Sequence, residues 1–208
     1  MAVSGAALFA FIVGHLLGNL QIFLGPEPLN RYSAFLKNLG ELLWIARIGL
    51  LVMVGIHIWT AISLTLENRA ARPIAYANKE YITASYASRT MDFSGIIILT
   101  YLIYHLMHFT FLKVHPEFGH LTDAQGRHDV YRMVVMSFQQ PAVAVIYIIA
   151  NLLLGMHLSH GLYSMFQSLG LVGEAVRPKL RCAANIVGYG IFIGYAMIPL
   201  SVWLGFVK

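Results

Sequence analysis

Long apolar stretches separated by short polar connectors dominate the chain. A helix needs about 20 largely apolar residues to cross a bilayer, because each residue adds about 1.5 Å of rise. Five stretches meet this requirement, and no soluble domain fits into the connectors. We therefore predict an all-α integral membrane protein with a single membrane domain, residues 1–208, whose first four helices form a bundle. The predicted membrane helices cover about residues 2–24, 42–66, 91–113, 141–166 and 186–207.

Prolines and glycines mark the ends of these stretches. Gly25-Pro26-Glu27-Pro28 is a strong helix breaker and ends the first. Pro141 suits the first turn of the fourth helix, where no N–H donor is needed. Pro199 lies inside the fifth helix and predicts a kink there. The connectors before the third and fourth helices, about 25 residues each, are long enough for a short interfacial helix.

Composition supports the membrane interpretation. The chain is 58% hydrophobic and only 11% charged, whereas soluble domains carry about 25% charged residues. Its net charge of +5 comes from basic residues scattered singly through short loops. Nucleic-acid binding is excluded as an interpretation, because no dense basic patch with interleaved aromatics exists.

Cysteine usage excludes several redox centres from this chain. Cys182 is the only cysteine, so no internal disulfide forms. The sequence has no C-x-x-C-H motif for covalent haem and no cysteine cluster for iron–sulfur chemistry. Any iron–sulfur centre must therefore belong to another chain.

The N-terminal stretch is expected to remain as a helix. It lacks the basic segment and the small-residue cleavage site of a signal peptide. Five helices put the two ends of the chain on opposite sides of the membrane. Loops on the N-terminal side hold seven Lys and Arg, against five on the other side, or six with Lys208. The positive-inside rule then places the N-terminus in the cytoplasm. The seven are Arg69, Arg72, Lys79, Arg89, Arg177, Lys179 and Arg181, and the five are Arg31, Lys37, Lys113, Arg127 and Arg132.

Histidines carry the candidate chemistry. Three of the nine lie in the loop after the third helix and are expected to be solvated; they are His115, His120 and His128. Ionisable residues at membrane depth are expensive and usually mark a function. The first four helices each bear such histidines: His15, His57, His105 with His108, and His157 with His160.

The depth of these histidines suggests two pairs. Counted along each helix, His15 and His105 lie at one level, and His57 and His157 lie about 6–8 Å nearer the N-terminal side. Two haems stacked across a membrane need opposed imidazoles at matched depth on different helices. Glycines beside these histidines would make room for a flat macrocycle or for close helix packing. They are Gly14, Gly18, Gly55, Gly155 and Gly161.

Other membrane-embedded sites fit less well. A di-iron bundle or an ion carrier wants inward carboxylates, and no Asp or Glu lies in mid-membrane. A zinc or copper site built only from histidines remains an alternative. Spacing alone does not choose His105 over His108 or His157 over His160.

Several strings in order along the chain resemble one family, the di-haem cytochrome b anchor subunit of succinate:quinone oxidoreductases, of the type with a single five-helix anchor. This resemblance covers nearly the whole chain. Its carriers are GHLLGN at 14–19, ELLWIARIG at 41–49, LENRAARP at 66–73, SRTMDFSG at 88–95 and GMHLSHGLYSMF at 155–166. Some family members carry a glutamate at the position of Gly155.

The resemblance implies ligands, partners and a location. The axial ligands would be His15 with His105 for an outer haem, and His57 with His157 for an inner haem. The chain would be a subunit of succinate dehydrogenase or quinol:fumarate reductase in a bacterial cytoplasmic membrane. It would dock a flavoprotein and an iron–sulfur protein on the cytoplasmic face. Electrons would pass through two haems b to or from a membrane quinone, expected to be menaquinone. The direction, and an oligomer of the whole complex, are left open.

Polar residues near the two haem levels are candidates for further contacts. Haem propionates need cations or donors, and a quinone needs donors to its carbonyls. Candidates for the propionates or for contacts to the ligands are Arg89, Ser94, His108, His160, Arg177, Lys179 and Arg181; those for an outer quinone are Arg31, Tyr32, Lys37 and Glu41.

Two other functions are alternatives. One is a different bis-histidine cytochrome b, such as a b561-like electron carrier or a hydrogenase anchor. The other is a haem-free membrane scaffold or transporter.

Overall fold

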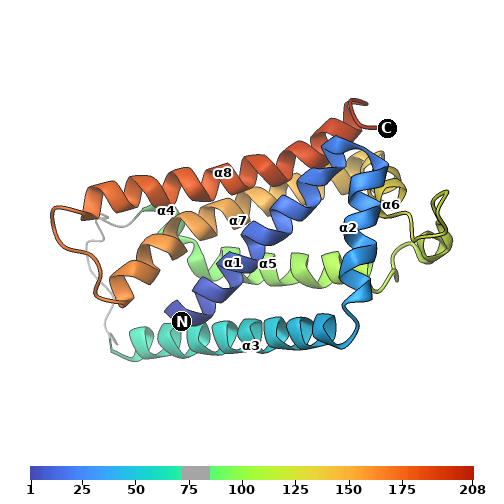
Figure 1. Cartoon of the computed structure of the whole chain (residues 1–208). Helices are drawn as coiled ribbons and strands as arrows, with labels where there is room; N and C mark the ends of the chain where they lie inside the picture. Colours follow the sequence, from blue (N-terminus) through green and yellow to red (C-terminus); the bar gives the residue numbers. More distant parts are fainter. Residues whose placement is uncertain (72–84) are drawn as a thin grey trace.

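The computed structural model describes residues 1–71 and 85–208 and consists of long helices (Figure 1). Within these residues, five helices are long and apolar enough to cross a membrane. We conclude that the chain is an all-α, multi-pass membrane protein. Its elements are α1 Ala2–Asn19, η1 Leu20–Leu24, α2 Pro26–Asn38, α3 Glu41–Ala70, α4 Tyr86–Arg89, α5 Met91–His105, η2 Leu106–Thr110, η3 Pro116–His120, α6 Val130–Phe138, α7 Pro141–Ser168 and α8 Arg177–Trp203.

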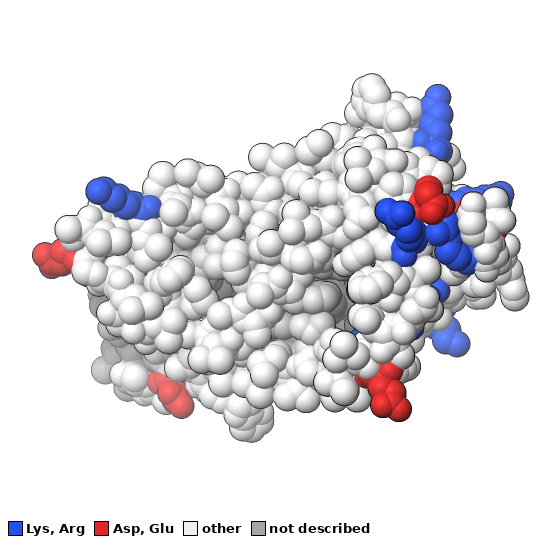
Figure 2. Space-filling model, in the orientation of Figure 1, with Lys and Arg blue, Asp and Glu red and all other residues white. Residues whose placement is uncertain are grey.

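Charged side chains gather at the two ends of the molecule. Figure 2 shows an uncharged belt between them, of the kind that faces lipid. The long axes of α3, α5, α7 and α8 cross this belt, and α1 crosses it obliquely (Figure 1). We call the end that holds the N-terminal ends of α5 and α8 the inner end, and the opposite end the outer end. Arg72 and Lys79, which enter the orientation argument, lie outside the described residues.

The last membrane helix begins earlier than predicted. The sequence predicts residues 186–207, but α8 runs from Arg177 to Trp203. Hydropathy marks only the part of a helix that lies in lipid, and Pro178 occupies a position in the first turn, where proline is tolerated. Lys179 and Arg181 therefore lie on a helix and not in a loop. Pro199 lies inside α8 as expected, while the kink remains a prediction.

A helix that the sequence did not predict lies across the outer end. Gly25 adopts a φ of 98°, which turns the chain sharply after η1. Pro26 then begins α2, which crosses the outer end of the bundle between α1 and α3 (Figure 1). The segment was interpreted only as a breaker, although proline is favoured in the first turn of a helix as much as beyond its end.

Helix α3 is the least enclosed of the membrane helices. It has no buried residue along its whole length. Its main helix contact is with α1, and Figure 1 shows it set apart from α7 and α8. By contrast, α7 and α8 form the largest helix interface in the described part of the chain.

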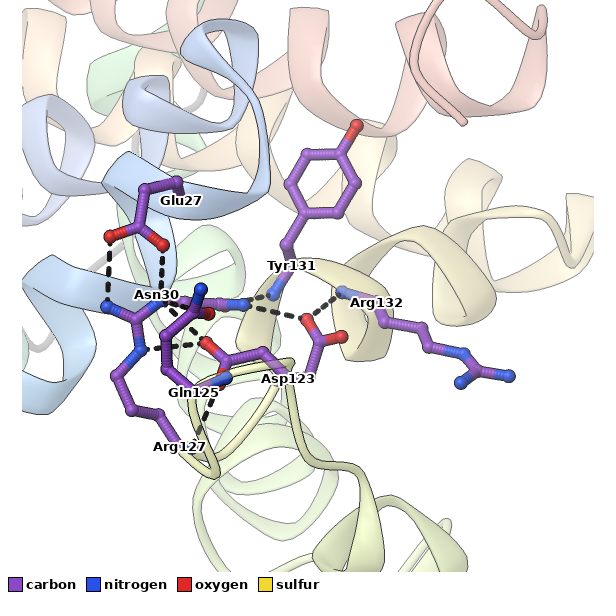
Figure 3. A network of polar contacts seen from close by, with 8 residues as sticks. Glu27, Asn30, Asp123, Gln125, Arg127, Tyr131 and Arg132 are labelled. Carbon is purple, nitrogen blue, oxygen red and sulfur yellow. Dashed lines mark hydrogen bonds and ion pairs between the residues drawn. The ribbon is translucent and has the colours of Figure 1, made fainter.

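A polar network holds α2 onto the loop and helix at the outer end (Figure 3). Arg127 pairs with Glu27 of α2, and its Nε donates to Asp123 at 2.7 Å. Asn30, which is 1% exposed, donates to the Asp129 carboxylate at 2.9 Å and accepts from the Tyr131 backbone N–H at 2.9 Å. These bonds anchor a helix that lies outside the apolar belt.

This network predicts that the attachment of α2 to the outer end weakens at low pH. The hydrogen bond from Arg127 lowers the pKa of the Glu27 carboxyl below its ordinary value of 4.5. A carboxyl with a depressed folded-state pKa stabilises the fold above its unfolded pKa, and this contribution is lost as pH falls through the folded-state pKa. We expect the protection factors of the α2 backbone amides, corrected for the pH dependence of intrinsic exchange, to be lower below pH 4.5 than at neutral pH. Glu27→Gln should remove most of this pH dependence, and an unchanged pH profile in this variant would contradict the assignment.

Candidate functional site

His15 of α1 and His105 of α5 face each other in the outer half of the bundle. Their ring centroids lie 5.9 Å apart, with an interplanar angle of 87°. Phe11, one turn before His15, stacks on the His15 ring at 5.3 Å. The two histidines come from segments ninety residues apart, so only the packing of α1 and α5 against α7 brings them together.

His57 of α3 and His157 of α7 form a second pair, nearer the inner end. Their ring centroids lie 6.5 Å apart, with an interplanar angle of 59°. The structure therefore brings together the same two pairs that the depth of the histidines suggested.

Both separations suit one metal ion between two imidazoles. With metal–nitrogen bonds of about 2 Å on opposite sides of one metal, ring centroids lie about 6 Å apart. The rings rotate freely about the shared axis, so both interplanar angles are compatible with this geometry. In residues 1–71 and 85–208, no three His, Cys, Asp or Glu side chains form a group that could hold a metal ion. Two histidines suffice for haem iron, because the macrocycle supplies the remaining ligands.

Serine hydroxyls contact the inner pair. Ser94 Oγ lies 3.2 Å from His157 Nδ1, and Ser4 Oγ lies 3.3 Å from His57 Nδ1. A hydrogen bond at one ring nitrogen fixes the tautomer and leaves the other nitrogen for a metal. Ser94 is among the residues that the sequence predicts to contact the ligands, but Ser4 is not. The only indication in the sequence for Ser4 is its position near the start of α1.

Tyr147 of α7 plays a similar part at the outer pair. Its hydroxyl lies 3.5 Å from His105 Nδ1 and 3.0 Å from His108 Nδ1. The tyrosine is 3% exposed and packs against both rings. The sequence does not single out Tyr147, because tyrosines are common within apolar helices and by themselves indicate no function.

The glycines near the histidines divide into two groups. A Cβ built on Gly14, Gly55 or Gly161 would meet no atom within 4 Å. Gly14 and Gly55 are exposed, whereas Gly161 lies one turn after His157 on the same face of α7. A Cβ on Gly18 would lie 2.6 Å from the Tyr32 ring, and one on Gly155 would lie 2.8 Å from Phe192 of α8. In the first group, Gly161 leaves room beside His157 for a flat macrocycle, whereas the second group permits close packing.

The neighbours of His105 and His157 have different surroundings. His108 lies in the wide turn η2, where the helix departs from regular α geometry, and its side chain is fully enclosed. Its Nδ1 lies near the Tyr147 hydroxyl, which also lies near His105 Nδ1, and a contact of His108 with a propionate stays a prediction. His160 is half-buried and shares a hydrogen bond with Ser164 at 3.1 Å.

A cavity of about 350 Å³ lies between α4, α7 and α8, at the helix turn after His157; neither His57 nor His157 lines it. His160, Tyr163, Arg181 and Asn185 line it, and the Arg181 guanidinium lies over the Tyr163 ring at 5.0 Å. Arg177 lines a neighbouring hollow on α8, and Lys179 is exposed. Arg89 is exposed at the end of α4. Of the basic candidates, Arg181 therefore lies best to meet an anionic group.

The predicted outer quinone residues do not gather in a described cavity. Arg31, Lys37 and Glu41 are exposed, and the Tyr32 ring lies against Gly18. Desolvation, followed by the positive charge of Arg47, lowers the pKa of the Lys37 ammonium. These residues remain candidates by their position at the outer end only.

Of the three histidines in the loop after η2, two differ from the expectation that all are solvated. The His115 side chain is 21% exposed and stacks on Phe118 at 4.8 Å. The half-buried His128 contacts the Leu121 carbonyl at 3.2 Å. Packing inside the loop, which the polar composition did not indicate, encloses both rings. His120 is exposed, as predicted.

Comparisons with protein-family models, curated proteins and solved structures find no match to this chain.

Proposed function

We propose that this chain is a di-haem cytochrome b that anchors a succinate:quinone oxidoreductase in the bacterial cytoplasmic membrane. The observation that carries the proposal is that the histidines of four helices face each other in two pairs. Four membrane helices each contribute one ring, and both ring separations suit a single iron. His15 and His105 would hold the outer haem, and His57 and His157 the inner one.

The exposure of α3 along its whole length also supports haem binding. A membrane helix without a buried residue makes few contacts that could hold it in the bundle. A macrocycle held by His57 would give α3 a partner on the side of α7. Gly161, one turn after His157 on the same face of α7, would leave room for a macrocycle, because a Cβ built on it meets no atom within 4 Å.

The chain's own residues would position and tune the cofactors. When bound, each haem supplies one-electron transfer. Ser4, Ser94 and Tyr147 would hold the ligand rings through Nδ1 and so keep the other nitrogen directed at iron. Arg181 and His160 would meet the propionates of the inner haem, because their cavity adjoins the helix turn after His157.

The partners follow from the resemblance in sequence. A flavoprotein and an iron–sulfur subunit would dock on the inner, cytoplasmic face and interconvert succinate and fumarate. The anchor itself would bind no dicarboxylate and would exchange electrons with menaquinone in the lipid phase. Arg31, Tyr32, Lys37 and Glu41 stay candidates for an outer quinone site.

A reduced-minus-oxidised optical spectrum of the purified full chain tests the haem assignment. We expect b-type bands and a haem content of two per chain, because each histidine pair would complete one iron. A chain without b-type bands would be a haem-free scaffold or transporter, and the proposal would fail.

Co-purification from the native membrane tests the assignment to this oxidoreductase. We expect a flavoprotein and an iron–sulfur protein to accompany the chain, and succinate to reduce its haems. Haem without these partners would instead favour a b561-like carrier or a hydrogenase anchor.

A further inference from the structure

One buried ring nitrogen at the outer end has no hydrogen-bond partner. His108 is 0% exposed, and its Nε2 is the only buried side-chain nitrogen or oxygen in the described residues without a partner. Its Nδ1 lies 3.0 Å from the Tyr147 hydroxyl. Leaving a buried polar atom unpaired is energetically costly, so such atoms often indicate a missing ligand.

A second histidine lies beside the His108 ring. The ring centroids of His108 and His115 are 5.5 Å apart, with an interplanar angle of 49°. His115 Nδ1 lies 3.0 Å from the Glu117 carboxylate. Both Nδ1 atoms are thus held by oxygen partners, which leaves Nε2 of each ring for another ligand. His115 is partly exposed in its loop, and this gives solutes a path to the pair.

We propose that His108 and His115 bind a divalent transition-metal ion of the zinc class. Two imidazoles on one tetrahedral metal, with bonds of about 2 Å, have ring centroids about 5 Å apart. The observed 5.5 Å is nearer to this value than the separations of the two candidate haem pairs. Its two ligands belong to neither haem pair, although the Tyr147 hydroxyl lies near both His105 and His108, and the proposal does not depend on the proposed function.

The surroundings of the pair match a metal site beyond the two ligands. Histidine ligands commonly donate their other ring N–H to a carboxylate or another oxygen, which fixes the ring and raises its basicity. Glu117 would do this for His115, and Tyr147 for His108. Water would complete the coordination from the loop side. With two protein ligands the ion would exchange with solution, so binding is measurable by titration.

Competition with a fluorescent zinc chelator tests the proposal on the full chain in detergent, after removal of any affinity tag. We expect the wild type to bind one Zn²⁺, and His115→Gln and His108→Gln each to weaken binding by at least about 10-fold. His120→Gln is the matched control, because this histidine lies in the same loop but is exposed. It should bind Zn²⁺ like the wild type.

Cobalt provides a spectroscopic check on the same variants. Co²⁺ bound to the wild type should give the visible bands of a tetrahedral site, and His115→Gln should abolish them. No Zn²⁺ binding by the wild type, or equal weakening in His120→Gln, would overturn the proposal. Haem spectra recorded on the same samples keep this outcome separate from a failure of the proposed function.

Discussion

Replacing His57 by leucine should remove the inner haem and leave the outer one. His57 is the ligand that α3 would contribute, and its ring lies 6.5 Å from that of His157. Loss of an orienting partner alone weakens metal binding by about 10–100-fold, and loss of the ligand itself should cost at least as much. The haem content should therefore fall from two per chain to one, as measured by extracted haem against protein.

The other ligand variants sharpen this result. His157→Leu should give the same phenotype as His57→Leu, and His15→Leu should remove the other haem. The remaining haem should keep its spectrum and potential in each case, since the two pairs lie at different depths. His120→Leu is the control, because His120 is exposed and belongs to neither pair. If His57→Leu and His157→Leu both kept two haems, the ligand assignment would be wrong.

The same variant should loosen α3. A ligand that binds only the folded state stabilises it by mass action, and α3 has no buried residue of its own to compensate for a lost haem. We expect proteases to cleave the ends of α3 faster in His57→Leu than in His15→Leu. Equal cleavage in the two variants would show that α3 does not depend on the inner haem.

Replacing Gly188 by alanine should destabilise the chain far more than the same change at Gly190. A Cβ on Gly188 would lie 2.6 Å from the Gly155 carbonyl oxygen and 2.8 Å from the Ser159 nitrogen. These are backbone atoms of α7 and cannot rotate away, so α8 would have to move. Overpacking of this kind costs roughly 1–3 kcal/mol. A Cβ on Gly190 would meet nothing within 4 Å.

Thermal unfolding of the two variants in the same detergent measures this difference. Gly188→Ala should lower the midpoint by several degrees, and Gly190→Ala should leave it nearly unchanged or raise it slightly through helix propensity. Equal midpoints would contradict the close crossing of α7 and α8. A side chain at Gly155 would likewise collide with Phe192.

Hydrophobic patterning alone determined the membrane architecture. The thickness of a bilayer sets a minimum helix length, so apolar runs separated by Glu, Arg and Pro predicted all five membrane helices. The rise per residue of an α-helix also predicted which histidines lie at equal depth. Depth follows from counting along one helix and needs no knowledge of its neighbours.

Tertiary structure decided everything that depends on how the helices are rotated and packed. In the folded chain His105 lies beside His15, whereas His108 faces Tyr147 and His115. The spacing of His105 and His108 along the helix does not decide which of the two pairs with His15. Tertiary structure also assigned Gly155 to a helix crossing and Gly161 to open space. Both residues are glycines beside a histidine in one sequence string, and only the position of α8 distinguishes them.

The helices outside the apolar belt were the least predictable. The amphipathic α2 and the first turns of α8 are too polar for a hydropathy signal, and the contacts that stabilise α2 come from distant residues such as Arg127 and Asp129. A sequence therefore shows which segments are apolar enough to lie in the bilayer and which are polar enough to stay outside it. Contacts between segments, which position Ser4 on His57 and leave His108 Nε2 without a partner, exist only in the folded chain.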